Sequence, residues 1–333
     1  MKIRSVIVLC VTTMICVSAV FADSGFKKLY DKLLPASVEI LAKGRNAGSG
    51  SFVSADGLVL TASHIFVANG EDCVIEVLSR KFGRLDAELI EMDRGHDLAL
   101  LKVKKREKGG YPFLKIAKRN PSVGTEIYSV STPIYIHNIF NKAVVASDRV
   151  DYQHTTYCDG YAEVLYIITQ SPRGSSGGVW VNAHAEIVGV QSGWVNSLGR
   201  DNDSSGINFI GPASAIADFI KRPFPPEIPW LGVLVEELWT QSSELISEFP
   251  PETYGLIVSK IEKGGPFDVA GGRKDGVITH IDGHPVSYRH DLLKYVRTKN
   301  PGEKMTLRMI YRKAGVVEKR VELARMNNGR TKR

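Results

Sequence analysis

Residues 48–64 read GSGSFVSADGLVLTASH, and the fold prediction depends on the pattern that they contain. A strand-like segment ends near Val53, residues 54–57 follow with an Asp and a Gly, and a second segment, a short apolar run, extends from Leu58 to Ala62. Asp and Gly favour tight turns, and short runs on either side of such a turn are typical of paired strands. The second run stops at Ser63 and His64, so we expect a titratable side chain where a strand ends.

Similar runs continue along the first two thirds of the chain. They are short, carry β-branched or alternating apolar residues, and are separated by clusters of Gly, Pro, Asn or Asp, which favours an antiparallel barrel or sandwich. Helical periodicity is expected only over 26–34 and 213–220. The predicted strands beyond the opening stretch are SVEILAK (37–43), CVIEVL (73–78), DLALLKV (97–103), EIYSVST (126–132), AEVLYIIT (162–169), VWVN (179–182) and EIVGVQSG (186–193).

A proline-dense segment, KRPFPPEIP at residues 221–229, separates this region from a smaller unit. Such a segment suits a stiff connector better than a strand or helix interior. Beyond it, residues 230–323 alternate short strands with one clear helix over 289–297, which indicates a small mixed domain. The predicted division is 1–22 export segment, 23–222 first domain, 223–229 linker, 230–325 second domain and 326–333 basic tail.

The first 22 residues begin with basic side chains, continue with an apolar stretch and end in small residues at the positions that a signal peptidase inspects. This pattern predicts export to the periplasm or the extracellular space, or a membrane anchor if the segment is retained. In an oxidising compartment Cys73 and Cys158 either form a disulfide or remain two buried thiols.

Charge and metal-ligand patterns exclude several function classes. The formal charge is +7, but five of these charges lie in the first and last few residues, so residues 23–325 hold only +2. A nucleic-acid-binding surface would need a basic stripe with interleaved aromatics, and the folded region has none. No metal site or cofactor is expected. The remaining histidines show no metal spacing and are predicted to lie on loops or the surface; they are His96, His137, His154, His184, His280, His284 and His290.

The segment GSSGG at residues 174–178 is weak evidence for a catalytic serine when taken alone, because glycine-rich turns are common. It also satisfies the G-x-S-x-G pattern of α/β hydrolases, but the chain lacks their alternation of strands and helices. More informative is the order of His64, Asp97 and Ser176, each placed next to a predicted strand. This is the order found in chymotrypsin-like proteases.

The blocks LTASH, DLALLKV and GSSGG resemble those of trypsin-like serine proteases, and residues 33–222 are similar to the protease domain of the HtrA (Deg) family. The resemblance implies a chymotrypsin-like double β-barrel and a triad in which His64 is the general base and Asp97 orients it. It assigns the nucleophile to Ser176, since Gly177 and Gly178 follow directly. The amides of Gly174 and Ser176 are expected to form the oxyanion hole.

The same resemblance places the substrate pocket after the nucleophile strand. Its expected lining is Gln191, Ser192, Gly193 and Trp194, together with residues 205–209. Neither segment supplies an acidic floor, so apolar or small side chains are expected before the scissile bond.

Residues 230–323 resemble a PDZ domain of the HtrA type, which implies capture of a peptide C-terminus as an added strand. The resemblance assigns the carboxylate-binding segment to Trp230, Leu231, Gly232 and Val233, and the groove wall to a helix bearing Leu293. The expected function is that of an exported serine endopeptidase that cleaves misfolded or exposed polypeptides. The resemblance also implies assembly as a homo-trimer through an apolar N-terminal segment, for which the candidates are Phe26, Leu29, Tyr30 and Leu33; alternatively, these residues dock a helix on their own barrel. The alternatives are a catalytically silent chaperone or peptide-binding scaffold, and a secreted protease of narrow specificity.

Overall fold

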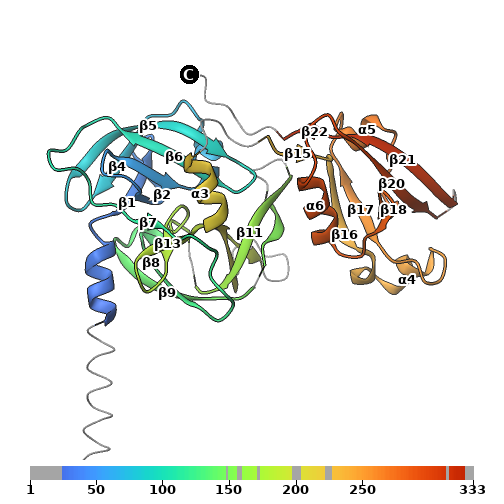
Figure 1. The fold of residues 1–333 in the computed structure, drawn as a ribbon, viewed down its shortest axis with the longest axis horizontal. Coiled ribbons are helices and arrows are strands. Elements are labelled where there is room, and N and C mark those ends of the chain that lie inside the picture. The colour runs from blue at the N-terminus through green and yellow to red at the C-terminus, as the bar shows by residue number, and fades with distance from the viewer. Residues whose placement is uncertain are drawn as a thin grey trace, which may run out of the picture.

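The computed structural model describes residues 25–147, 149–155, 160–170, 173–196, 204–221, 227–312 and 315–326. The predicted export segment, Cys158, residues 223–226 of the predicted linker and residues 327–333 of the predicted tail lie outside these ranges. The fold is mainly β, as the sequence predicts, and comprises two closed or nearly closed strand systems followed by a smaller domain (Figure 1).

Six antiparallel strands close the first barrel, in the order β1-β2-β3-β6-β5-β4. The opening stretch of the sequence supplies β2 and β3, which pair at Ser51 with Leu60 and at Phe52 with Val59. Phe52, Val59 and Leu60 are completely buried and form part of the core. The strands are β1 (Ser37–Ala42), β2 (Arg45–Phe52), β3 (Leu58–Thr61), β4 (Ile75–Ser79), β5 (Gly83–Asp93) and β6 (Leu98–Val103).

The second barrel is an eight-stranded sheet that runs β10-β11-β14-β13-β12-β8-β9, with β7 beside β13. Pairing of Ile167 in β11 with Val145 in β9 brings the two ends of the sheet together. Trp180 and Ile127 are buried in its core. The strands are β7 (Lys115–Ile116), β8 (Glu126–Ser131), β9 (Ile139–Val145), β10 (Asp151–Thr155), β11 (Gly160–Ile168), β12 (Val179–Val181), β13 (Glu186–Asn196) and β14 (Ser204–Pro212).

Both helices expected in the first domain are present. The first spans residues 25–33 and buries Leu29 and Leu33 against the first barrel, and the second is α3 (Ala213–Lys221). Two further short elements, α2 (His64–Asn69) and the 3-10 turn η1 (Pro133–Tyr135), were not predicted. Strand β3 ends at Thr61, so His64 begins a helix, and the prediction that it ends a strand is wrong by three residues.

The C-terminal domain is a six-stranded sheet, with β16 at one end of the order β16-β17-β18-β20-β21, covered by the helix α6 (Arg289–Arg297). Leu292 and Val296 of α6 belong to its core, which is separate from the cores of the two barrels. The remaining elements are β15 (Pro229–Trp230), β16 (Val233–Glu237), η2 (Leu238–Thr240), α4 (Ser243–Ser247), β17 (Leu256–Ile261), α5 (Pro266–Val269), β18 (Val277–Ile281), β19 (His284–Pro285), β20 (Lys304–Tyr311), β21 (Gly315–Glu322) and β22 (Ala324–Arg325).

Strands β10 and β11 of the second barrel meet α6 and β16 of the C-terminal domain (Figure 1). His290 lies 3.5 Å from Asp151 and 5.6 Å, between ring centroids, from Tyr152. The His290 side chain is only 13% exposed, so the prediction of a surface residue is wrong for it: a neighbouring domain covers the helix face that carries it. Within the described residues no helix is both long and apolar enough to cross a bilayer.

Candidate active site

The site forms where the two barrels meet, and its best-defined member is the carboxylate of Asp97, which is 5% exposed. One oxygen accepts hydrogen bonds from the Ser63 hydroxyl and the His64 amide, each at 2.9 Å. The other accepts from the Ser192 hydroxyl and lies 2.7 Å from Nδ1 of His64. A buried carboxylate needs such donors to remain charged, and four of them converge here.

His64 and Asp97 hold each other in their charged states. Burial alone would disfavour the His64 cation, but the adjacent carboxylate outweighs burial and raises the pKa of His64 above its ordinary value. Burial likewise works against the Asp97 anion, yet His64 and the Ser192 hydroxyl lower the pKa of Asp97. Because Nδ1 faces the carboxylate, any exchange of a proton with a group other than Asp97 takes place at Nε2.

A tight turn over residues 93–97 fixes the position of Asp97, whose φ of 53° is left-handed. The carboxylate of Asp93, 1% exposed, accepts from the Gly95 amide at 3.0 Å and lies 2.7 Å from Nδ1 of His96. His96 also lies 3.8 Å from Glu163 on β11, and its side chain is 16% exposed. The prediction that His96 lies on the surface is therefore wrong, because two acidic groups enclose it.

The loop carrying Ser176 is attached to the first barrel by its backbone. The Ser49 amide donates to the carbonyl oxygen of Ser176 at 2.7 Å, and the next amide, that of Gly177, donates to Gln191 at 2.8 Å. A Cβ placed on Gly177 would lie 2.1 Å from the Thr61 hydroxyl oxygen, and the φ of Gly177 is +80°. The loop therefore lies directly against the end of β3, three residues before His64.

Ser49 makes the connection through several atoms. Its hydroxyl donates to the carbonyl of Gly174 at 2.8 Å and accepts from the Thr132 amide at 3.0 Å, while its own carbonyl accepts from the Thr61 hydroxyl at 2.7 Å. One residue of the first barrel thus contacts both ends of the candidate nucleophile loop. No sequence motif indicates this role, because it depends on how the two barrels pack together.

The two adjacent serines differ in exposure. Ser175 is 4% exposed and its hydroxyl is buried without a hydrogen-bond partner in the described residues, whereas Ser176 is half-buried. Gly174 has a φ of +95°, and a Cβ there would lie 2.5 Å from the Thr132 carbonyl oxygen. Among the backbone hydrogen bonds of the described residues none is donated by the amides of Gly174 or Ser176, the pair predicted to bind an oxyanion.

Two of the predicted pocket residues, Gln191 and Ser192, have side chains bound within the protein. The Gln191 side chain is bound to the Trp180 indole at 2.9 Å and to the Gly193 carbonyl at 3.0 Å, and the Ser192 hydroxyl is bound to Asp97. The side chains of Gln191 and Ser192 therefore support the framework of the site. A Cβ on Gly193 would lie 2.6 Å from the Phe209 ring, so an apolar ring stands beside this strand.

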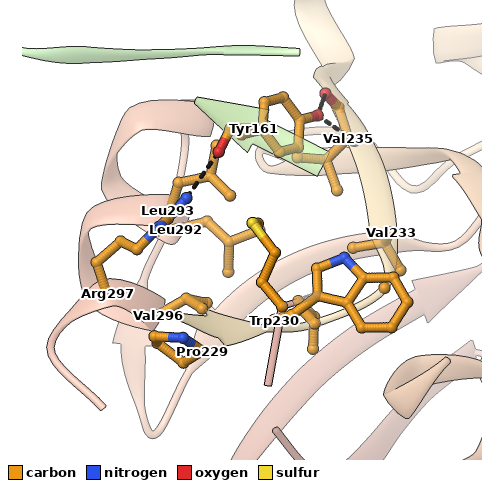
Figure 2. A pocket seen from close by; sticks show the side chains of 12 residues that line it. Tyr161, Pro229, Trp230, Val233, Val235, Leu292, Leu293, Val296 and Arg297 are labelled. Carbon is orange, nitrogen blue, oxygen red and sulfur yellow. Dashed lines mark hydrogen bonds between the residues drawn. The ribbon is translucent and has the colours of Figure 1, made fainter. Parts of the chain in front are cut away.

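The predicted carboxylate-binding segment and Leu293 line one pocket of the C-terminal domain, between β16 and α6 (Figure 2). Gly232 has a φ of +78° there, in a turn that a side chain would strain. Within the described residues no group of His, Cys, Asp and Glu side chains is arranged to hold a metal ion.

Comparisons with known proteins agree with this architecture. Residues 48–190 match the model of the trypsin-like peptidase domain, and residues 230–323 match that of the PDZ domain. The fold resembles the HtrA-type protease AlgW solved with a decapeptide (20% identity, TM-score 0.64, 90% of this chain and 98% of the other) and the serine endoprotease from Yersinia pestis (18%, 0.60, 90% and 98%).

The chain is thus a trypsin-like peptidase domain followed by a PDZ domain. Among curated proteins it is 27% identical over 274 residues to a probable periplasmic serine endoprotease DegP-like of Hahella chejuensis, and 28% over 273 residues to that of Ectopseudomonas mendocina. These alignments cover 81% and 80% of this chain but only 55% and 54% of the relatives, so the chain spans just over half their length. The chain is therefore similar to proteases of the HtrA (Deg) type, as its sequence motifs predict.

Proposed function

We propose that this protein is an exported serine endopeptidase that cleaves misfolded or otherwise exposed polypeptides, with Ser176 as nucleophile, His64 as general base and Asp97 as the group that orients the imidazole. The observation that carries the proposal is the convergence of four hydrogen bonds on the Asp97 carboxylate, one of them with His64 Nδ1. A carboxylate held in this way fixes the ring and stabilises the imidazolium that forms during acyl transfer.

The proposed reaction uses these three side chains in the roles named above. Nε2 of His64 takes the Ser176 proton as the hydroxyl oxygen attacks the peptide carbonyl, and later returns it to the leaving amine. The amides of Gly174 and Ser176 stabilise the negative oxygen of the intermediate. Gly193, Trp194 and Phe209 line the pocket for an apolar side chain before the cut, which is supported by the ring of Phe209 against Gly193.

A fluorophosphonate probe and casein test this proposal. Wild type is expected to be labelled at Ser176 and to cleave casein, and Ser176→Ala is expected to lose both, with at least about a thousandfold loss of activity. Ser175→Ala is the matched control and retains labelling, because its hydroxyl is buried away from the substrate. Equal cleavage by wild type and Ser176→Ala contradicts the assignment, and an unlabelled, inactive wild type favours the scaffold hypothesis.

Export to the periplasm is part of the proposal. It is supported by the pattern of residues 1–22 and by the relatives named as periplasmic endoproteases. Cys73 is partly buried. In such a compartment two states are proposed for it: a disulfide with Cys158, or a free thiol. Mass spectrometry of the periplasmic protein identifies the mature N-terminus and the thiol state together.

Assembly as a homo-trimer is also proposed, through an aromatic surface near the N-terminal helix. Phe26 is 40% exposed, and its ring lies 5.5 Å from Tyr128 and 6.5 Å from Phe140 between centroids. Leu29 and Leu33 are buried within the same chain, so Phe26 and its neighbours are the side chains available to a partner. Sedimentation velocity is expected to show trimers for wild type and smaller species for Phe26→Ala.

A further inference from the structure

The pocket of the PDZ domain lies between the edge strand β16 and the helix α6, where an added peptide strand would pair with β16 (Figure 2). On one side β16 pairs with β17, and β16 ends the order of the sheet. Its outer edge therefore presents backbone donors and acceptors that need a partner. The occupant of that edge decides whether the groove is open.

In this conformation the partner is a side chain of the peptidase domain. The Tyr161 hydroxyl, carried by β11, accepts a hydrogen bond from the Val235 amide at 2.9 Å and donates to the Val235 carbonyl at 3.1 Å (Figure 2). A single hydroxyl thus satisfies both main-chain groups of one edge residue. These are the groups that the backbone of an added strand would otherwise engage.

The Tyr161 ring also takes the apolar part of the groove. It is 5% exposed and packs in a cluster with Leu293 of α6, Tyr152 of β10 and Leu234 of β16. The space that remains in the pocket is about 20 Å³, enough for roughly one water molecule and not for a peptide.

Helix α6, on the other side of the groove, binds the backbone of Tyr161. Arg297 of α6 donates from Nη2 to the Tyr161 carbonyl oxygen at 2.6 Å, and the guanidinium of Arg289 lies 5.7 Å from the centroid of the Tyr161 ring. Strand β16 and helix α6, the two walls of the groove, therefore both form hydrogen bonds with Tyr161 of the other domain. Tyr161 thus occupies the groove in the way that a bound ligand would.

We propose that Tyr161 is an internal occupant of the PDZ groove, so that an extended peptide binds only by displacing it and parting β11 from β16 and α6. This inference rests on the peptide-binding role proposed above for the PDZ domain. It makes the affinity for peptides a competition with one tyrosine, set by the hydroxyl, the ring and the Arg297 contact.

Peptide binding by the full chain tests the competition. All variants carry Ser176→Ala, so that neither cleavage nor its absence affects the result. The probe is a fluorescein-labelled pool of heptapeptides ending in Val, Leu, Ile or Phe with a free carboxylate, and an amidated pool reports binding that is independent of the chain end. Tyr161→Phe is expected to bind the free-acid pool about five- to tenfold more tightly than the parent, because two hydrogen bonds no longer hold the groove shut.

Tyr166→Phe is the matched control, since Tyr166 lies on the same strand but donates its hydroxyl to Gln153, outside the groove. It is expected to bind like the parent. Tyr161→Ala removes the ring as well and is expected to bind at least as tightly as Tyr161→Phe. Hydrogen exchange of the Val235 amide is expected to accelerate in Tyr161→Phe and to remain unchanged in Tyr166→Phe.

Two results overturn the proposal. One is equal affinity and equal Val235 exchange in the parent and in Tyr161→Phe, which would mean that the tyrosine does not close the groove. The other is the absence of binding even in Tyr161→Ala, since a vacated groove should accept a chain end. Fluorophosphonate labelling of the protein that retains Ser176 tests the proposed peptidase activity separately. Failure of the groove proposal can therefore be distinguished from failure of the proposed function.

Discussion

Gly177 combines two constraints that no other residue type satisfies at its position. Its φ is +80°, and a side chain there would meet both the Thr61 hydroxyl and, at 2.3 Å, the Ser49 carbonyl oxygen. Positive φ alone is costly for other residues, by roughly 1–2 kcal/mol. The steric contact comes in addition, so the position should tolerate nothing larger than glycine.

We predict that Gly177→Ala lowers the free energy of unfolding by about 2–4 kcal/mol and abolishes cleavage of casein. Gly124→Ala is the matched control, because Gly124 has a φ of +82° with no atom within 4 Å of the added Cβ. It should cost only about 1 kcal/mol and retain activity. Urea denaturation of both variants measures the difference, and equal destabilisation would show that backbone strain alone is responsible.

The pH dependence of cleavage is a second prediction at the scale of residues. In the proposed reaction His64 must be neutral to accept the Ser176 proton. Burial opposes the charged form of His64, but the Asp97 carboxylate outweighs burial and raises the pKa of His64 above 6.5. Activity should therefore be present at alkaline pH and be lost as the pH falls through this raised pKa. A profile of kcat/KM against pH with its acidic limb at or below 6.5 would contradict this account.

The turn over residues 93–97 is an element that holds a charged histidine inside the protein. Burial opposes the charge on His96, but Asp93 on the same turn and Glu163 on β11 raise the pKa of His96 to about 9. Burial opposes the Glu163 anion, but His96 and then Arg297 of α6 lower the pKa of Glu163. Because its pKa is raised, the charged form of His96 contributes its full stabilisation below pH 6.5, as long as the two carboxylates stay ionised, and this contribution is lost as the pH rises through about 9.

We predict that His96→Asn destabilises the protein by on the order of 2–3 kcal/mol near pH 6, and that the difference from wild type largely disappears near pH 10. Free energies of unfolding at the two pH values provide the measurement. A constant difference at both values would assign the role of His96 to packing alone.

Elements with a continuous apolar run or a clear helical period could be predicted from the sequence. Elements that are very short, or whose apolar residues alternate with charged ones, could not. The helix predicted over 289–297 matches α6, and β3 and β6 follow from their apolar runs. Strand β5 was missed because Asp86 and Glu88 interrupt its apolar residues, although both simply face solvent on the outside of the barrel. Helix α2 has only six residues, too few for a periodic signal.

The candidate site shows the same division. Three blocks in the right order predicted His64, Asp97 and Ser176. No sequence pattern predicted that the Ser63 and Ser192 hydroxyls also donate to Asp97. Ser192 lies 95 residues from Asp97 in the chain, and only the meeting of β13 with the start of β6 brings their side chains together. Contacts of this kind depend on tertiary structure, which a single sequence does not display.

At the scale of the whole molecule, the turn that holds Asp97 is also where the peptidase and PDZ domains touch. A Cβ on Gly95 would lie 1.9 Å from Cδ1 of Ile228 and 3.1 Å from Nη1 of Arg297. The absence of a side chain at this position permits the close approach. The relative placement of the domains therefore depends on one glycine beside the candidate catalytic residues.

We predict that Gly95→Val forces the domains apart and increases the radius of gyration measured by small-angle X-ray scattering. The double variant Gly95→Val/Ile228→Ala should return the radius toward that of wild type, because alanine removes both atoms of Ile228 that the valine would meet. An unchanged radius in Gly95→Val would show that the seam adapts without separating.

The contacts of Ser49 have a consequence for folding during synthesis. This residue of the first barrel holds Gly174 and Ser176 of the second, so the nucleophile loop acquires its shape only after both barrels exist. During synthesis the first barrel is made well before residues 174–177 leave the ribosome. A chain that ends before residue 174 therefore cannot form the contacts of Ser49 with Gly174 and Ser176, and we expect it to show no activity toward casein.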